Sequence, residues 1–290
     1  MRVRLHVGPP GTGTARIQQG SLARRETLAG AGILSMQGPG KSDGIPKALI
    51  ALDVERALRE FDRLFGAARD EVPRARDAHT LLYSSDVFFQ ADSRLKPDFE
   101  RAFASFLEGL ASRGHDVDVV FVERPIEDLL MSHALLQASL GDLRYVSADP
   151  GAFLEYVDSY AWLKGVYFAR CPVLHLDFNV LDASGDLFSN FMKASCGIDV
   201  PPVGAAKDDE TVTDRHVARG LLMAPLVNWM ELFGSVSRAD LINAAHLKPP
   251  IPDGLLDESA ASIPLLRDCL RATARRAIEM YVKRHAAVAP

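Results

Sequence analysis

The sequence lacks the features that mark several classes of protein. Its three cysteines, Cys171, Cys196 and Cys269, lie far apart, with no CxxC pair and no Cys/His cluster at metal-ligand spacing. The number and spacing of the cysteines argue against a disulfide framework and predict no structural zinc site. No apolar run approaches the roughly 18 residues needed to span a bilayer, and no signal segment follows Met1. We expect a soluble, cytoplasmic protein with reduced thiols.

An excess of positive charge is also missing. The chain carries 33 Lys and Arg against 38 Asp and Glu, for a formal net charge of −5. No global basic field therefore predicts binding to nucleic acid or to an anionic membrane. Any anionic ligand has to be held by a local site.

Strands and helices are predicted in alternation over the first two thirds of the chain. Apolar segments at 3–7, 79–83, 117–122 and 173–178 predict strands, and residues 14–31, 54–68, 98–113, 126–140, 152–168 and 186–196 predict helices. Such alternation is typical of α/β proteins, in which a central parallel sheet flanked by helices binds ligands at the strand carboxyl ends.

The last third of the chain has a different pattern. Residues 217–233, 239–246 and 263–284 predict helices, whereas residues 34–45 and 200–209 predict loops. We expect one domain over 1–290, with an α/β nucleotide-binding core at about 1–200 and a helical extension at about 211–290.

A glycine-rich turn joins the first strand to the first helix. Residues 8–15 read GPPGTGTA, at a point where amides of a turn and of a helix N-terminus converge on an anion. The ATP-binding motif GxxxxGK[ST] requires a lysine and a hydroxyl where this chain has Thr14 and Ala15. No predicted strand ends in a pair of acidic residues for magnesium, so a degenerate P-loop NTPase is the weakest alternative.

The strongest predicted strand, 117–122, leads to a second phosphate ligand. Arg124 follows this strand, and Ser132 lies eight residues further along on the next predicted helix. Arginine presents a charged fork to a phosphate, and a hydroxyl two turns down the helix can donate to the same group.

These two stretches resemble the nucleotide signatures of the sulfotransferases that use 3′-phosphoadenosine 5′-phosphosulfate (PAPS), most closely their bacterial, carbohydrate-type branch. In that family PxKTGTT holds the 5′-phosphosulfate, and an arginine with a serine eight residues on holds the 3′-phosphate. HVGPPGTGTARIQQ matches the first signature except that Gly11 replaces the lysine, and Arg124 with Ser132 matches the second. Ser84-Ser85-Asp86, VLHLDFNVL and DLFSNFMKASCGID extend the resemblance over about residues 3–200.

The resemblance implies a P-loop-like sulfotransferase fold and transfer of a sulfuryl group from PAPS to a hydroxyl or amine of a small-molecule or carbohydrate acceptor. Transfer would be by in-line displacement, without a metal, and would release 3′,5′-ADP. The implied nucleotide ligands are Pro10, Gly11, Thr12, Gly13, Thr14, Ala15, Arg124 and Ser132. Asp86 and His133 are the candidate general bases, whereas His6 is expected to cap a strand and His175 to lie in the core.

Gly11 leaves two alternatives open. In the family, the lysine at this place neutralises charge on the bridging oxygen, and losing one such contact costs on the order of 10²–10³ in rate. One hypothesis is that Arg16, in the first helical turn, or Lys41, in the loop at 34–45, supplies the charge. The alternative is a catalytically silent relative that still binds a 3′-phosphorylated nucleotide.

Overall fold

The structure is a computed structural model, which describes residues 1–36, 43–72, 77–91, 95–146, 149–201, 214–233 and 253–286, without the side chains of 223, 225–233 and 253. The chain forms two compact units. Unit 1 comprises Met1–Arg124 and Ser159–Asp209, and unit 2 comprises Pro125–Asp158 and Glu210–Pro290. Unit 2 thus groups residues 125–158, which the sequence pattern assigns to the α/β core, with the C-terminal helices.

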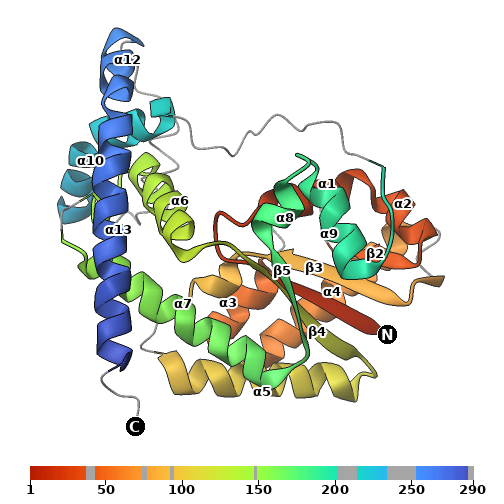
Figure 1. Ribbon diagram of the computed structural model, residues 1–290. Helices are drawn as coiled ribbons and strands as arrows, with labels where there is room; N and C mark the ends of the chain where they lie inside the picture. The colour runs from red at the N-terminus through yellow and green to blue at the C-terminus, as the bar shows by residue number, and fades with distance from the viewer. Residues whose placement is uncertain are drawn as a thin grey trace. The chain divides into compact units, whose positions relative to one another are not determined.

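Unit 1 is built on a five-stranded parallel sheet of order β2-β3-β1-β4-β5 (Figure 1). The strands are β1 (Arg2–Val7), β2 (Ile33–Ser35), β3 (Thr80–Ser85), β4 (Asp116–Glu123) and β5 (Val173–Asp177). The predicted α/β class, with a central parallel sheet flanked by helices, is confirmed.

Helices of unit 1 cover both faces of this sheet (Figure 1). They are α1 (Thr14–Ala23), α2 (Arg25–Gly30), α3 (Gly44–Ile50), α4 (Val54–Glu71), the short η2 (Val87–Phe89), α5 (Lys96–Ser112), α8 (Phe178–Asp182) and α9 (Leu187–Cys196), together with the second part of α7 (Gly151–Arg170). Residues 119–122 of β4 are fully buried, as expected for a central strand covered on both faces.

The strand order places a topological switch point at β1 and β4. The chain leaves β1 toward β2 on one side of the sheet, and leaves β4 toward β5 on the other. Val7, the last residue of β1, pairs with Ser85 of β3 and Phe121 of β4. Ligands of open α/β sheets bind outside the carboxyl ends at such a point, where the loop after β1 and Arg124 both lie.

Short elements are the ones that the sequence did not predict. β2, α3, α8 and α12 (Asp253–Ala261) have 3, 7, 5 and 9 residues, too few for a periodic pattern to show. The helix predicted over 14–31 is divided at Arg24 into α1 and α2. The helix predicted over 239–246 lies outside the described residues.

Unit 2 consists of helices around a second core. It contains α6 (Ile126–Ser139), the first part of α7, α10 (Asp214–Phe233), α12 (Asp253–Ala261) and α13 (Ile263–Ala286). Its buried residues include Leu130, Phe153 and Leu270. None of the helices that the structure describes is long and apolar enough to cross a membrane.

Candidate functional site

The loop between β1 and α1 is shaped by two glycines with left-handed backbone. Gly11 has φ 89° and Gly13, the N-cap residue of α1, has φ 80°. Thr12 donates from both its amide and its hydroxyl to the carbonyl of Pro9, at 3.2 and 2.7 Å. Thr12 is fully buried and its hydroxyl holds the turn, while its predicted role as a nucleotide ligand stays a prediction. The first amides of α1 have no intrahelical acceptor and carry the positive end of the helix dipole.

Polar atoms converge on Gly8, where the loop begins. A Cβ atom at Gly8 would lie 2.6 Å from Thr12 Oγ1, 3.0 Å from His6 Nε2 and 3.2 Å from Thr14 Oγ1. His6 is 0% and Thr14 5% exposed, and within the described part of the chain neither His6 Nε2 nor Thr14 Oγ1 has a hydrogen-bond partner. Buried polar atoms without a hydrogen-bond partner are costly. The loop therefore suits a ligand whose oxygen atoms form hydrogen bonds with these two atoms.

His6 lies inside β1 rather than at a strand end, which corrects the expectation that it caps a strand. Its Nδ1 lies 2.7 Å from Ser84 Oγ, and its ring packs edge-on against Phe191 at 5.0 Å. Burial lowers the pKa of His6 to about 3. The imidazole under the loop is therefore neutral at physiological pH.

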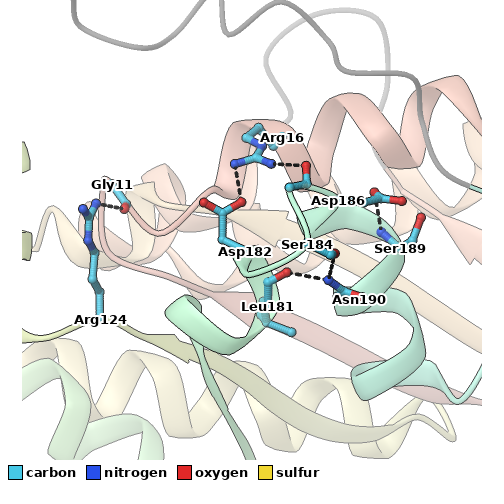
Figure 2. Close-up of polar contacts among 10 residues, drawn as sticks. Gly11, Arg16, Arg124, Leu181, Asp182, Ser184, Asp186, Ser189 and Asn190 are labelled. Carbon is cyan, nitrogen blue, oxygen red and sulfur yellow. Dashed lines mark hydrogen bonds and ion pairs between the residues drawn. The ribbon is translucent and has the colours of Figure 1, made fainter.

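Arg124 reaches the loop from the end of β4. Its Nη1 donates to the Gly11 carbonyl at 3.0 Å, and its guanidinium carbon lies 5.0 Å from the centre of the Phe178 ring. Figure 2 shows the side chain extended toward Gly11. The predicted combination of the glycine-rich loop and Arg124 is thus brought together within unit 1.

Phe178 and Leu187 wall the same loop, although nothing in the sequence pattern gives them a role there. A Cβ atom at Gly13 would lie 2.8 Å from Leu187 Cδ1 and 3.3 Å from Phe178 Cε2. Asp177 fixes the start of α8 by accepting from the amide of Asn179 at 2.7 Å. Since Phe178 begins α8, this cap also sets the position of the ring beside Arg124.

Arg16 is engaged away from Gly11 (Figure 2). Its Nη1 donates to Asp182 Oδ1 at 2.8 Å and its Nη2 to the Gly185 carbonyl at 3.1 Å. Asn190 holds the same turn by donating to the Leu181 carbonyl at 2.7 Å. In this arrangement Arg16 does not supply the charge of the missing lysine, and Lys41 lies outside the described residues.

Asp86 follows β3 and is the N-cap residue of η2. It lies at the carboxyl end of the sheet, where the loop after β1 also begins, because Val7 of β1 pairs with Ser85 of β3. Burial raises the pKa of its carboxyl, a backbone hydrogen bond opposes this rise, and the charge of Asp43 adds to it. Asp43 accepts from Ser85 Oγ at 3.1 Å. A partly buried carboxylate with a raised pKa suits a proton acceptor.

No family model, curated protein or solved structure matches this chain. The interpretation of the loop therefore rests on its residues and on its geometry. Among the described residues, no group of three or more His, Cys, Asp or Glu side chains is placed to hold a metal ion.

Ser132 and His133 belong to unit 2, on α6. Both are partly buried, and the His133 ring packs 4.9 Å from that of Tyr145 and 4.4 Å from that of Tyr156. Burial lowers the pKa of His133 to about 4. The roles predicted for these two residues stay predictions, as do those of the half-buried Pro10 and Ala15.

His175 is not a core residue as the sequence suggested, because β5 is the edge strand and leaves 48% of its side chain exposed. Its Nε2 lies 2.5 Å from Oε2 of Glu123, the last residue of β4. Oε1 of Glu123 accepts from Lys164 Nζ at 2.5 Å and from Tyr160 OH at 3.2 Å. These residues come from three separate elements, β4, α7 and β5, and form no motif, so nothing in the sequence identifies the cluster.

Proposed function

We propose that unit 1 binds a nucleotide bearing a 3′-phosphate and that the protein is a sulfotransferase using PAPS as donor. The observation that carries the proposal is the hydrogen bond from Arg124 to the Gly11 carbonyl. It sets a permanent cation beside a loop that offers helix amides and a buried Thr14 hydroxyl to an anion. The acceptor would be a hydroxyl or amine of a small molecule or carbohydrate.

In the proposed reaction, residues of unit 1 bind the charged phosphates of the nucleotide and hold its sulfuryl group in line with the acceptor. Amides of Gly13, Thr14 and Ala15 face the 5′ end of the nucleotide, and Arg124 faces a second phosphate. The acceptor oxygen or nitrogen forms a bond to sulfur while the sulfur–oxygen bond to the nucleotide breaks. Preorganised donors stabilise the negative charge that collects on the leaving phosphate, and no metal is needed for this step.

A second candidate function is nucleotide binding without catalysis. It is favoured by the contacts of Arg16 with Asp182 and with the Gly185 carbonyl, since Gly11 brings no charge of its own. A protein of this kind would keep the loop and Arg124 while transferring nothing.

Calorimetry tests the nucleotide assignment. We expect 3′,5′-ADP to bind more tightly than ADP or ATP, with or without magnesium. Arg124→Ala should weaken the binding of 3′,5′-ADP by about 10-fold or more, since a charge-assisted contact contributes roughly 1.5–3 kcal/mol. Arg59→Ala is the matched control because Arg59 is an exposed arginine on α4.

Equal binding of ADP and 3′,5′-ADP would reject both the enzyme and its silent relative, and magnesium-dependent preference for ATP would favour a degenerate NTPase. If 3′,5′-ADP is preferred, transfer of radiolabelled sulfate from PAPS to a panel of sugars, phenols and amines separates the first two candidates. The double variant Arg16→Ala/Lys41→Ala then tests the substitute cation, because unchanged turnover would exclude both residues.

A further inference from the structure

A buried histidine lies under the glycine-rich loop, and the nucleotide contacts proposed above make no use of it. His6 belongs to β1, two residues before Gly8, and is 0% exposed. Among the described residues, its Nε2 has no hydrogen-bond partner. A buried ring nitrogen without a partner is costly, so its presence requires an explanation other than folding.

The Nε2 atom of His6 points to the place where the loop meets α1. It lies 3.0 Å, and Thr14 Oγ1 lies 3.2 Å, from the position that a Cβ atom at Gly8 would take. Thr14 is the first residue of α1, and its buried hydroxyl also lacks a partner among the described residues. The amide of Thr14 is one of those that face the 5′ end in the proposed function. A ligand oxygen that meets Thr14 there therefore comes within reach of His6.

The rest of the imidazole is held in place by its neighbours. Nδ1 lies 2.7 Å from Oγ of Ser84 on β3, and the ring packs edge-on against Phe191 of α9 at 5.0 Å. A hydroxyl both donates and accepts, so Ser84 can donate to Nδ1 while the ring hydrogen stays on Nε2. An anion offers acceptors alone and selects this tautomer, in which Nε2–H donates to it.

The imidazole of His6 is a neutral donor rather than a cation. Burial lowers its pKa to about 3, so the ring carries no charge at neutral pH. The positive end of the α1 dipole lies beside it and favours a neutral imidazole over a charged one. Hydrogen bonding from His6 therefore adds to the helix amides without repelling their partial charge.

We propose that His6 is a further ligand of the 5′ group of the nucleotide and that its neutral Nε2–H replaces part of the stabilisation missing at Gly11. Nε2–H and the Thr14 hydroxyl both donate to oxygens of the 5′ phosphate. As the bond from sulfur to the bridging oxygen breaks, its electron pair stays with this phosphate, and the two donors stabilise the added charge. His6 itself neither gains nor loses a proton. This inference rests on the proposed function.

Two substitutions at His6 separate a contact with the nucleotide from a structural role. The side-chain nitrogen of glutamine lies about where Nε2 lies in histidine, and that of asparagine about where Nδ1 lies. His6→Gln thus keeps a donor toward the loop, whereas His6→Asn keeps only the contact with Ser84. By calorimetry, His6→Asn should raise the Kd of 3′,5′-ADP by about 10-fold or more and His6→Gln by less than about threefold. A structural role alone would reverse this order.

Nuclear magnetic resonance of the ¹⁵N-histidine-labelled full chain tests the direction of the hydrogen bond. The signals that disappear in His6→Asn identify the His6 ring. When 3′,5′-ADP saturates the wild type, we expect these signals to show a neutral ring with its hydrogen on Nε2. A hydrogen on Nδ1 alone, or a charged ring, in this complex would overturn the proposal.

Turnover tests the role of His6 in the reaction. With an acceptor found for the wild type, His6→Asn should lower kcat by about 10²–10³-fold, the usual cost of one preorganised donor, and His6→Gln should recover most of this loss. His115→Asn is the matched control, because the His115 ring packs 5.2 Å from that of Phe61. His115 precedes Asp116, which pairs with Arg2 at the end of the sheet away from the loop. Its Kd and kcat should match the wild type.

Failure of this inference is distinguishable from failure of the proposed function. A wild type that binds ADP and 3′,5′-ADP equally defeats the proposed function, and the inference with it. A wild type that prefers 3′,5′-ADP while His6→Asn keeps its Kd and kcat, or while His6→Asn and His6→Gln lose equally, defeats only the role of His6. If circular dichroism shows that His6→Asn does not fold, His6→Gln identifies the signals instead, and the position of the ring hydrogen in the wild-type complex decides.

Discussion

At the scale of single residues, the loop depends on glycines for two different reasons. Gly11 adopts φ 89°, a conformation that costs other residues roughly 1–2 kcal/mol. Gly11, the residue at which the loop departs from the sulfotransferase signature that it resembles, is therefore also the residue that this backbone favours, and a lysine there would be strained. Gly13 combines a positive φ with close contact to Leu187, so both backbone and packing exclude a side chain.

Comparing Gly13→Ala with Gly185→Ala separates the backbone strain of a positive φ from the packing against Leu187. Backbone strain of about 1–2 kcal/mol and overpacking of about 1–3 kcal/mol should both lower the free energy of unfolding, as measured by urea denaturation. Gly185→Ala is the control, because Gly185 has φ 75° but a Cβ atom there would meet no described atom within 4 Å. Equal losses in the two variants would show that Leu187 does not constrain the loop.

At the scale of elements, short helix α8 links several parts of the candidate site. Asp177 caps it, Phe178 at its start packs on Arg124, and Asp182 at its end pairs with Arg16. A five-residue helix has little stability of its own. Its position therefore depends on its cap and on the turn toward α9.

We expect Asp177→Ala to lower the free energy of unfolding by about 1 kcal/mol, the usual cost of losing an N-cap. It should also weaken binding of 3′,5′-ADP, because Phe178 and then Arg124 lose their support. Asp53→Ala removes a comparable cap, the one that accepts from Arg56 N at the start of α4, and should cost stability alone. Calorimetry and thermal denaturation of both variants measure the difference, and equal nucleotide affinities would remove α8 from the site.

At the scale of the whole molecule, each unit contains a histidine that burial keeps neutral. The pKa falls from 6.5 to about 3 for His6 in unit 1 and to about 4 for His133 in unit 2. Below pH 6.5 the unfolded chain binds protons at these positions and the folded chain does not. Acidification therefore favours unfolding, and the effect is complete only below the folded pKa values.

Between pH 6.5 and about 4, each histidine should reduce the free energy of unfolding by up to about 1.4 kcal/mol per pH unit. Urea denaturation across this range measures the slope. His6→Gln/His133→Gln should flatten it, whereas His285→Gln, at an exposed position, should leave it unchanged. A slope that the double variant keeps would assign the acid sensitivity to other groups.

The sequence by itself determined the α/β class, the long elements and the loop with Arg124. Continuous apolar strands and helical periodicity extend over enough residues to be read locally, and a glycine-rich turn between strand and helix has a local geometry. In the structure β1 pairs with β4, and this pairing brings Arg124, which follows β4, to the Gly11 carbonyl in the loop after β1.

Only the tertiary structure decided which polar groups meet. The engagement of Arg16 by Asp182, the packing of Phe178 on Arg124 and the pairing of His175 with Glu123 all join residues that are distant in sequence. Such contacts depend on strand order and on burial, which no short pattern encodes. For the same reason the apolar strand around His175 predicts a core residue, whereas its place on the edge strand β5 leaves it half exposed.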